Sequence, residues 1–560
     1  MESRKSWFRY RYIVWTIMVL CWLLEALSYR HSVYPDGIAY LEIASACAKG
    51  NWHSLINGYW SPAYPALFSF VLSVFKPSVV WELALLHCFN CLVLVGSLAS
   101  FEYFLNALIH YLSITKRAID QEWKPLPAWV FRAIGYALFF WDSVYATPPS
   151  VETPDVLVLA LVLLAVGILL RIASGRDSWQ YYAALGVVLG LAYLTKAAMF
   201  PLSFVFLAVV PFATGNLRRG ASRALLAFAL FLLIASPFAL TLSKIKGRLT
   251  FGDSGRINYA EYVNSVRPIA HWQGGPPGSG IPLHPTRKIL DTPSVYEFAT
   301  PLGGSYPPWT DQSYWYEGVR PHFELGGQLK VLRHSLATYF GISMQISSLS
   351  VIPLIVLFCF DRFGNVARSF SRLFFLWIPA LSALGLYSLI LVEPRYVTPF
   401  ILLLWAATYS ALRVPQSDIS KVIVRASAFV VVLLLGFQSI WAVGLAAAHL
   451  TLHRDFPAWT VAKELHHARI QPGERVAAIG DTISDHHWAH LAGVTIVAQV
   501  PAESVSTFLA SGPERRMETM GLLARSGAKA VVANDLPPLL LQEGWQEIAD
   551  TKYFIFVYRN

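Results

Sequence analysis

The stretch of sequence that decides the fold is residues 79–109, VVWELALLHCFNCLVLVGSLASFEYFLNALI. About 20 such residues in an α-helix, at about 1.5 Å each, already cross the ~30 Å hydrocarbon core of a bilayer. The whole chain shares this character, because 55% of its 560 residues are hydrophobic and only 14% are charged. Soluble proteins carry roughly 25% charged residues. We infer that lipid is the main solvent of this chain.

Further apolar runs accompany this one, and together they predict about eleven transmembrane spans in an all-α bundle. They occupy residues 12–28, 128–146, 156–172, 181–194, 199–212, 225–242, 336–360, 373–391, 396–412 and 422–450. Another apolar run, 63–75, is too short to cross the ~30 Å core. We expect it to re-enter the membrane or to lie in the interface.

Basic residues predict the orientation of the chain. They cluster at residues 4–11, 116–124, 171–176, 218–223, 362–372 and 413–425. Lys and Arg are enriched in cytoplasmic loops. If the N-terminus is cytoplasmic and 63–75 does not cross, every cluster falls in the cytoplasm and the C-terminus is extracytoplasmic. The Lys and Arg residues of these loops explain the net charge of +10. The sequence has no stripe of basic residues interleaved with aromatic residues, so we expect no nucleic-acid partner.

The chain is predicted to have two domains. Residues 1–450 form a transmembrane module with long external segments at 29–75 and 243–333, and residues 451–560 form a small soluble α/β domain. In the latter, strand patterns at 475–480, 494–500, 529–533 and 553–558 alternate with helical patterns at 458–467 and 516–525. Segment 243–333 shows no obvious regular elements, so it is either a lid over a cavity or an aromatic-rich loop on the membrane interface.

Acidic side chains occupy two of the predicted external segments. Asp36 follows Pro35 in the first of them. It could cap the next helix, or its carboxylate could accept a proton from a hydroxyl group. The short turn 147–155 carries Glu152 and Asp155. A capping role would explain Asp155, but it explains Glu152 poorly.

Cations are predicted on the same side of the membrane. Lys196 lies between two apolar runs, where a lysine is costly unless it is paired or reaches the interface. It could instead serve as a cation for an anionic lipid headgroup. Arg395, in the turn that also holds Glu393 and Tyr396, carries a guanidinium fork that suits phosphate. Glu393 and Arg395 could also be ordinary exposed turn residues. Together these side chains predict a site for an anionic, lipid-linked substrate.

With Asp36, residues 59–65, residues 190–196 and residues 393–396, the sequence resembles the GT-C superfamily of polyprenyl-phosphate-sugar glycosyltransferases. It is most similar to bacterial aminoarabinose transferases and protein O-mannosyltransferases. The resemblance implies a GT-C-like bundle in a bacterial inner membrane that transfers a hexose or pentose to a glycan, lipid or protein acceptor. Protein mannosyltransferases often carry two adjacent acids in the first loop. Here Gly37 follows Asp36, which argues against a protein acceptor.

The resemblance also implies roles for individual residues. Asp36 is expected to act as the catalytic acid or base in an inverting displacement, with Glu152 as a second catalytic candidate, and Lys196 and Arg395 are expected to bind the donor phosphate. The remaining pocket candidates are Tyr40, Tyr64, Asp155, Glu393 and Tyr396. Some members of the superfamily need a divalent metal such as Mg²⁺ or Mn²⁺. Oxygens of Asp36, Glu152 and Asp155 could bind one, and the sequence leaves this open.

Two other functions compete with sugar transfer. A transporter or flippase of a lipid-linked sugar would be expected to show an internal repeat, which the sequence lacks. A non-catalytic membrane scaffold could use its external domain to bind a cell-wall partner. In that domain His486 and His490 share a helix face, as zinc ligands can, but no third ligand is evident.

Overall fold

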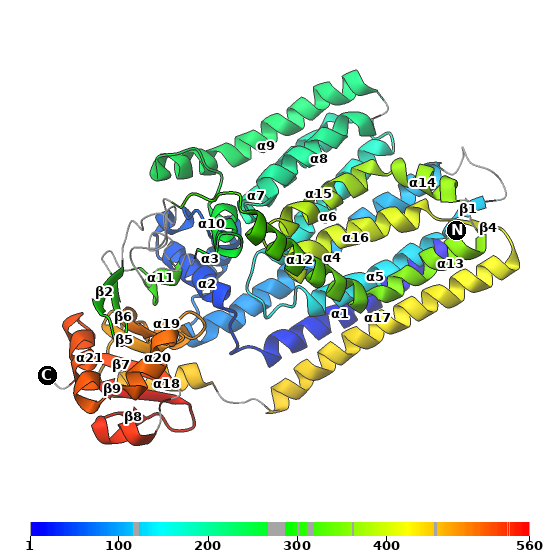
Figure 1. The fold of residues 1–560 in the computed structure, drawn as a ribbon. Helices are drawn as coiled ribbons and strands as arrows, with labels where there is room; N and C mark the ends of the chain where they lie inside the picture. Colours follow the sequence, from blue (N-terminus) through cyan, green and yellow to red (C-terminus); the bar gives the residue numbers. More distant parts are fainter. Residues whose placement is uncertain are drawn as a thin grey trace. The chain divides into compact units, whose positions relative to one another are not determined.

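The computed structural model describes residues 2–115, 123–214, 216–266, 286–298, 303–310, 319–360, 363–452, 456–534, 536 and 538–558. These residues form two compact units, and each unit is assembled from three segments of the chain (Figure 1). Unit 1 comprises Met1–Arg30, His87–Gly255 and Leu325–Leu452, and unit 2 comprises His31–Leu86, Arg256–Glu324 and His453–Asn560.

Unit 1 is a helical bundle. Its helices are α1 (Glu2–Ser28), α4 (Val79–Thr115), α5 (Ala128–Tyr145), α6 (Asp155–Ala173), α7 (Trp179–Thr195), α8 (Met199–Ala213), α9 (Leu217–Lys246), α12 (Leu325–Gln345), α13 (Val351–Phe360), α14 (Phe363–Ser371), α15 (Phe374–Ser388), α16 (Pro394–Ala411) and α17 (Asp418–Leu452). The first turns of α4 belong to unit 2. A short antiparallel pair, β1 (Trp123–Pro125) and β4 (Arg413–Pro415), joins two of the connections.

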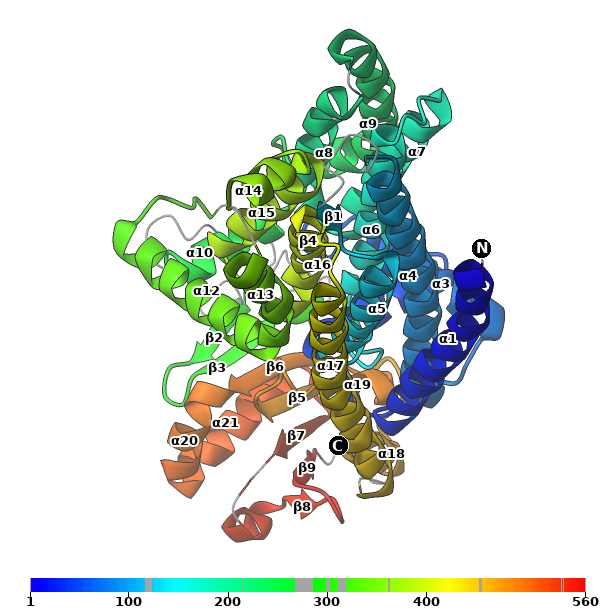
Figure 2. The same ribbon diagram turned by 90° about the vertical axis from the view of Figure 1, so that its right-hand side faces the viewer.

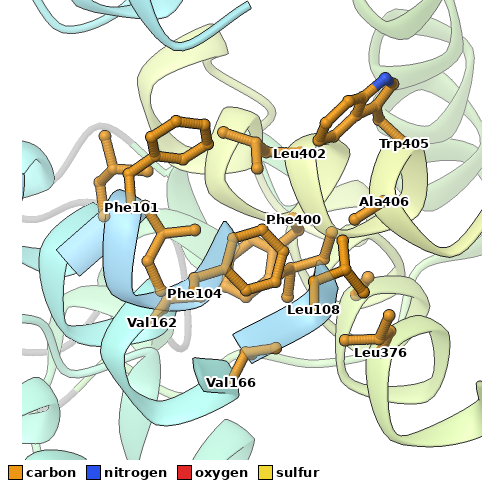
Figure 3. Packing of buried hydrophobic residues seen from close by; sticks show 14 of the residues in the cluster. Phe101, Phe104, Leu108, Val162, Val166, Leu376, Phe400, Leu402, Trp405 and Ala406 are labelled. Carbon is orange, nitrogen blue, oxygen red and sulfur yellow. The ribbon is translucent and has the colours of Figure 1, made fainter. Parts of the chain in front are cut away.

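The core of unit 1 is formed where α4, α6, α15 and α16 meet. Figure 3 shows buried side chains from these four helices packed against one another, among them Phe101, Phe104, Leu108, Val162, Val166, Leu376, Phe400, Leu402, Trp405 and Ala406. Lipid tails are as apolar as these side chains, so close van der Waals packing has to hold the helices together. This core fixes the starts of α6 and α16, where the candidate site lies.

Helices α7 and α9 approach closely through two glycines, Gly186 and Gly190, spaced as in a GxxxG motif. A Cβ atom at Gly186 would lie 2.2 Å from the backbone oxygen of Ala227 in α9, and one at Gly190 would lie 2.7 Å from Cβ of Ile234. Any larger residue at these positions would push the two backbones apart.

The chain is a multi-pass membrane protein. By length and composition, five helices in the described part of the chain could cross a membrane, or up to six if one bent pair counts as a single span. Shorter apolar helices are Ala63–Phe75, Met199–Ala213 and Phe374–Ser388. The first of these, α3, coincides with the run that was expected not to cross. The total of eleven spans stays a prediction.

The run 336–360 is not the continuous helix that its composition suggests. Helix α12 ends at Gln345, a 3₁₀ turn covers Ser347–Ser350, and the helices on either side meet at an angle of 76°. Serine hydroxyl groups bond to nearby backbone and so compete with helical hydrogen bonds. Three serines lie between residues 347 and 350 and lower the helix propensity of this stretch.

Unit 2 contains a seven-stranded sheet in the order β2-β3-β6-β5-β7-β9-β8 (Figure 2). The strands are β2 (Thr286–Leu290), β3 (Val295–Phe298), β5 (Arg475–Gly480), β6 (Thr495–Pro501), β7 (Ala530–Asn534), β8 (Gln546–Glu547) and β9 (Tyr553–Val557). Strands β5, β6 and β7 pair in parallel. The predicted α/β character of the C-terminal residues is therefore confirmed, and β5 has the predicted bounds. The predicted domain boundary near residue 450 stays a prediction.

Helices and a hairpin complete unit 2. The helices are α2 (Pro35–Ala48), α3 (Ala63–Phe75), α10 (Ser254–Tyr262), α11 (Pro307–Thr310), α18 (Pro457–His467), α19 (His487–Ala492), α20 (Ala502–Ala510) and α21 (Pro513–Arg525), with 3₁₀ turns at Trp52–Leu55 and Pro538–Glu543. Strands β2 and β3 form an antiparallel hairpin whose Tyr296 pairs with Gln499 of β6. The expectation that segment 243–333 lacks regular elements is therefore wrong. The sequence does not reveal this hairpin because its edge strand β2 has five residues, of which one is buried.

We predict that Gly186→Val lowers the stability of the bundle. Overpacking a close contact typically costs about 1–3 kcal/mol, and here the added methyl groups meet backbone of α9. The measurement is the midpoint of thermal unfolding of the purified protein in detergent. Gly436→Val in α17 is the matched control, because a Cβ atom at Gly436 has no neighbour within 4 Å. Equal midpoints for the two variants would contradict the assigned contact.

Candidate functional site

Three helix ends of unit 1 meet around one carboxylate. Asp155 is the first residue of α6, Lys196 directly follows α7, and Arg395 lies in the first turn of α16. Nζ of Lys196 contacts Oδ1 of Asp155, and Nε of Arg395 lies 3.6 Å from Oδ2. The side chains of Asp155 and Arg395 are 3% and 9% exposed, so this ion-paired cluster is largely buried.

Aromatic rings complete the surroundings of the two cations. Nζ of Lys196 lies 3.3 Å from the ring centroid of Tyr396 and 6.0 Å from that of Tyr387. The guanidinium carbon of Arg395 lies 5.2 Å from the Tyr396 centroid. Cations are attracted to the faces of such rings. Lys196 therefore does not simply extend to water, and two cations around one carboxylate leave a net charge of +1.

The acidic residues at the helix starts do not cap them. The N-cap of α6 is Pro154 and that of α2 is Tyr34, and neither helix has a side-chain cap hydrogen bond. The interpretation of Asp155 and Asp36 as N-caps is therefore wrong. Both carboxylates lie in a first turn instead, where the helix dipole favours negative charge. Glu393 is the N-cap of α16, also without a side-chain cap bond.

The turn before α6 is fastened to other helices by buried polar contacts. Oε1 of Glu152 lies 2.5 Å from Nε2 of His87 in α4, and both side chains are fully buried. The hydroxyl group of Ser150 donates to Glu25 of α1, and the side-chain amide of Asn90 donates to the backbone oxygen of Pro149 at 2.9 Å. These contacts hold the turn in place. The catalytic role of Glu152 stays a prediction.

Sequence reasoning missed Glu25, His87 and Tyr387. Glu25 and His87 are ionisable residues inside apolar runs, and such residues mark functional or structural networks in membranes. That signal could have found them. Tyr387 sits in the apolar run 373–391, and nothing in the sequence separates it from an ordinary core aromatic.

An apolar cavity of about 640 Å³ lies between α8 and α15 in unit 1. It is lined by Phe204, Val205, Ala208, Val209, Phe212, Phe374 and Ile378. Helix α8 begins three residues after Lys196, and α15 leads into the turn that precedes Arg395. The lining residues lie at the ends of these helices away from the two cations, because residues 204–212 form the later part of α8 and residues 374–378 the first part of α15.

Unit 2 holds the remaining candidates. Asp36 lies half-buried in the first turn of α2, and the backbone oxygen of Pro35 accepts a hydrogen bond of 2.9 Å from Nε1 of Trp309. Tyr40, one turn further along α2, packs edge-on against Trp60 and against Tyr64 of α3 at centroid distances of 5.2 and 5.3 Å. Tyr40 and Tyr64 are thus brought together, but as interior side chains.

The predicted site residues are divided between the units. Unit 2 carries Asp36, Tyr40 and Tyr64, and unit 1 carries Glu152, Asp155, Lys196, Glu393, Arg395 and Tyr396. In unit 1, the structure brings Asp155, Lys196, Arg395 and Tyr396 into contact. That Asp36 shares a pocket with them stays a prediction.

The candidate metal ligands have other partners within their own units. Oxygens of Asp155 face Lys196, Arg395 and the hydroxyl group of Thr153, and an oxygen of Glu152 faces His87. Among the described residues, no group of three or more His, Cys, Asp or Glu is placed to hold a metal ion. Within unit 1, the carboxylates of Glu152 and Asp155 are thus engaged by other side chains.

No family model and no curated protein matches this sequence. Solved structures do match: ArnT from Cupriavidus metallidurans in the apo state has a TM-score of 0.54 at 13% identity, covering 98% of both chains. ArnT bound to undecaprenyl phosphate has a TM-score of 0.55 at 14% identity, covering 98% of this chain and 97% of that one. The likeness extends over both units and confirms the predicted GT-C fold.

We predict that Asp155→Asn destabilises unit 1 and that adding Lys196→Met restores part of the loss. Removing one partner of a buried ion pair costs about 3–5 kcal/mol, because the other charge stays uncompensated. Removing Lys196 as well takes away one of the two cations left uncompensated, while Arg395 remains. Thermal unfolding of the single and double variants measures this. The exposed pair Asp418–Lys421 is the control, where Asp418→Asn should cost less than about 1 kcal/mol. A double variant less stable than Asp155→Asn would refute the pairing argument.

Proposed function

We propose that this chain is an inverting membrane glycosyltransferase that moves a sugar from a polyprenyl-phosphate donor to an extracytoplasmic acceptor. One observation carries the proposal: Lys196 and Arg395 converge on a buried site in a fold shared, over almost its whole length, with a protein solved in complex with undecaprenyl phosphate. The likeness in sequence is low, so the activity rests on the chemistry of these residues.

The cationic cluster suits the phosphate of the donor. Its net charge of +1, from two cations and one carboxylate, favours an anion, and the guanidinium group of Arg395 can bind two phosphate oxygens at once. The apolar cavity between α8 and α15 offers a place for part of the isoprenoid chain. Headgroup and tail would then be bound by the same pair of helices and the residues at their ends.

Sugar transfer needs charge stabilisation at the leaving group and a base at the acceptor. The acceptor hydroxyl oxygen attacks C1 of the sugar while the bond from C1 to the phosphate oxygen breaks, and its electron pair stays on the phosphate. Lys196 and Arg395 stabilise this developing negative charge. Asp36 takes the hydroxyl proton, and Glu152 is a second candidate for this role. Attack opposite the leaving group inverts the anomeric centre.

The proposed setting is a bacterial inner membrane. The N-terminus faces the cytoplasm, as the basic loops indicate. Residues 1–450 act as the transmembrane transferase module, and residues 451–560 as the extracytoplasmic α/β domain. The acceptor is a glycan, a lipid or a protein, and Gly37 beside Asp36 argues against the last of these.

We predict that Asp36→Asn lowers kcat by about 10²–10⁴, the usual contribution of a general base, and leaves donor affinity unchanged. The change keeps the size of the side chain and removes its capacity to accept a proton. Transfer of radiolabelled sugar in proteoliposomes measures it. Asp291→Asn, which alters an exposed acid of unit 2, should retain activity. Normal turnover by Asp36→Asn would exclude this residue as the base.

We predict that Lys196→Met and Arg395→Gln each weaken binding of undecaprenyl phosphate by about 10- to 100-fold, since a charged hydrogen bond contributes about 1.5–3 kcal/mol. Titration of the purified protein in nanodiscs with this ligand gives the affinity, and binding of undecaprenol, which lacks the phosphate, should not change. Lys421→Met, at an exposed lysine, is the matched control. Unchanged affinity in both variants would contradict the proposed phosphate site.

A further inference from the structure

A buried histidine in unit 2 lies between two carboxylates. Nε2 of His490, in α19, is 3.0 Å from Oε2 of Glu82, and its Nδ1 is 3.5 Å from Oε1 of Glu42. The three side chains are between 6% and 13% exposed. With an acid facing each ring nitrogen, the arrangement favours an imidazolium cation.

The two carboxylates have further partners within unit 2. Oε1 of Glu42 accepts hydrogen bonds from the backbone N–H of Ser305, at 2.8 Å, and from its hydroxyl group. Oε2 of Glu42 accepts from the hydroxyl group of Thr310 at 2.5 Å. Oε2 of Glu82 accepts from the hydroxyl group of Ser45 at 3.3 Å. The cluster thus joins α2, the first turn of α4, α11 and α19.

The charges of this cluster are set by mutual contact. Burial lowers the pKa of His490, but hydrogen bonds and charges of Glu42 and Glu82 outweigh it and raise the pKa to about 9. Burial raises the pKa of Glu42, but His490 and the hydrogen bond from Ser305 lower it to about 2. The neighbouring His486 and His487 have pKa values lowered by burial, so they do not replace His490 as the cation near pH 7.

Helix α2, which carries Asp36, is therefore held at two places. Near its start, the backbone oxygen of Pro35 accepts a hydrogen bond from Trp309. In its second half, Glu42 binds Ser305, Thr310 and His490. Gly304 (φ +71°) lets the backbone approach closely, because a Cβ atom there would lie 2.3 Å from Oε2 of Glu42.

We propose that His490 is a positioning residue: as a buried cation shared by Glu42 and Glu82, it fixes helix α2 and so sets the place of Asp36. The inference rests on the proposed function, and it gives the C-terminal α/β residues a part in sugar transfer. They hold the helix that carries the base.

The positioning contact has a defined pH range. His490 is protonated more readily in the folded chain than at its ordinary pKa of 6.5, so its contribution is complete below about pH 6.5 and is lost as the pH rises through about 9. Glu42 contributes above about pH 4.5 and loses its contribution as the pH falls through about 2. Alkaline pH should therefore loosen α2 first.

The test is His490→Gln in the full-length protein in nanodiscs. We expect amide hydrogen exchange of residues 35–48 to rise at least about tenfold at pH 7, and kcat to fall about tenfold with the donor KM unchanged. A tenfold change corresponds to about 1.4 kcal/mol. In the wild-type protein, exchange of α2, corrected for its intrinsic base-catalysed rate, should rise with a midpoint near pH 9. This step should be absent in the variant.

The control is His467→Gln, which removes an exposed histidine paired with Glu464 and should change neither readout. Unaltered α2 exchange in His490→Gln would overturn the proposal, as would a wild-type profile without a step near pH 9. The wild-type profile decides the matter even if the variant does not fold. If the step appears but the wild-type protein transfers no sugar, the proposed function fails and the positioning contact stands.

Discussion

Pairing of buried charge is the constraint on which unit 1 depends. A lysine or arginine among apolar helices is stable only with a partner, and Asp155 supplies one to both Lys196 and Arg395. These residues come from three separate stretches of the chain. Their contact therefore brings together the start of α6, the start of α16 and the junction between α7 and α8. The packed side chains of Figure 3 include residues of α6 and α16, the two helices that carry Asp155 and Arg395.

Much of the fold could be predicted because long apolar runs in the sequence indicate which segments are surrounded by lipid. Long apolar runs predicted helices of unit 1, and a short apolar run predicted strand β5 with its observed bounds. The break at Ser347–Ser350 and the β2–β3 hairpin were not predictable in this way. The first lies in a run whose composition is otherwise that of a continuous helix, and the second depends on pairing with β6, a strand almost 200 residues away in the chain.

The candidate site was predictable where a charge stood out from its neighbours in sequence. Lys196 and Arg395 do, and the structure brings them together around Asp155. Tyr387, which lies beneath Lys196, looks like any core aromatic. The capping roles assigned to Asp36 and Asp155 failed because a cap is defined by backbone geometry, which places Tyr34 and Pro154 at those positions. The contact of Glu42 with His490 joins residues too distant for any sequence pattern to link.

The contacts of His490 with Glu42 and Glu82 have a consequence for biosynthesis. His490 follows its partner Glu82 by 408 residues, so at 5–20 residues per second a ribosome needs roughly 20–80 s to make the histidine after the acid. During translation Glu42 of α2 and Glu82 of α4 therefore lack their counter-ion until His490 has been made. Helix α2, near the start of the chain, therefore gains its full set of contacts only after α19 has been synthesised.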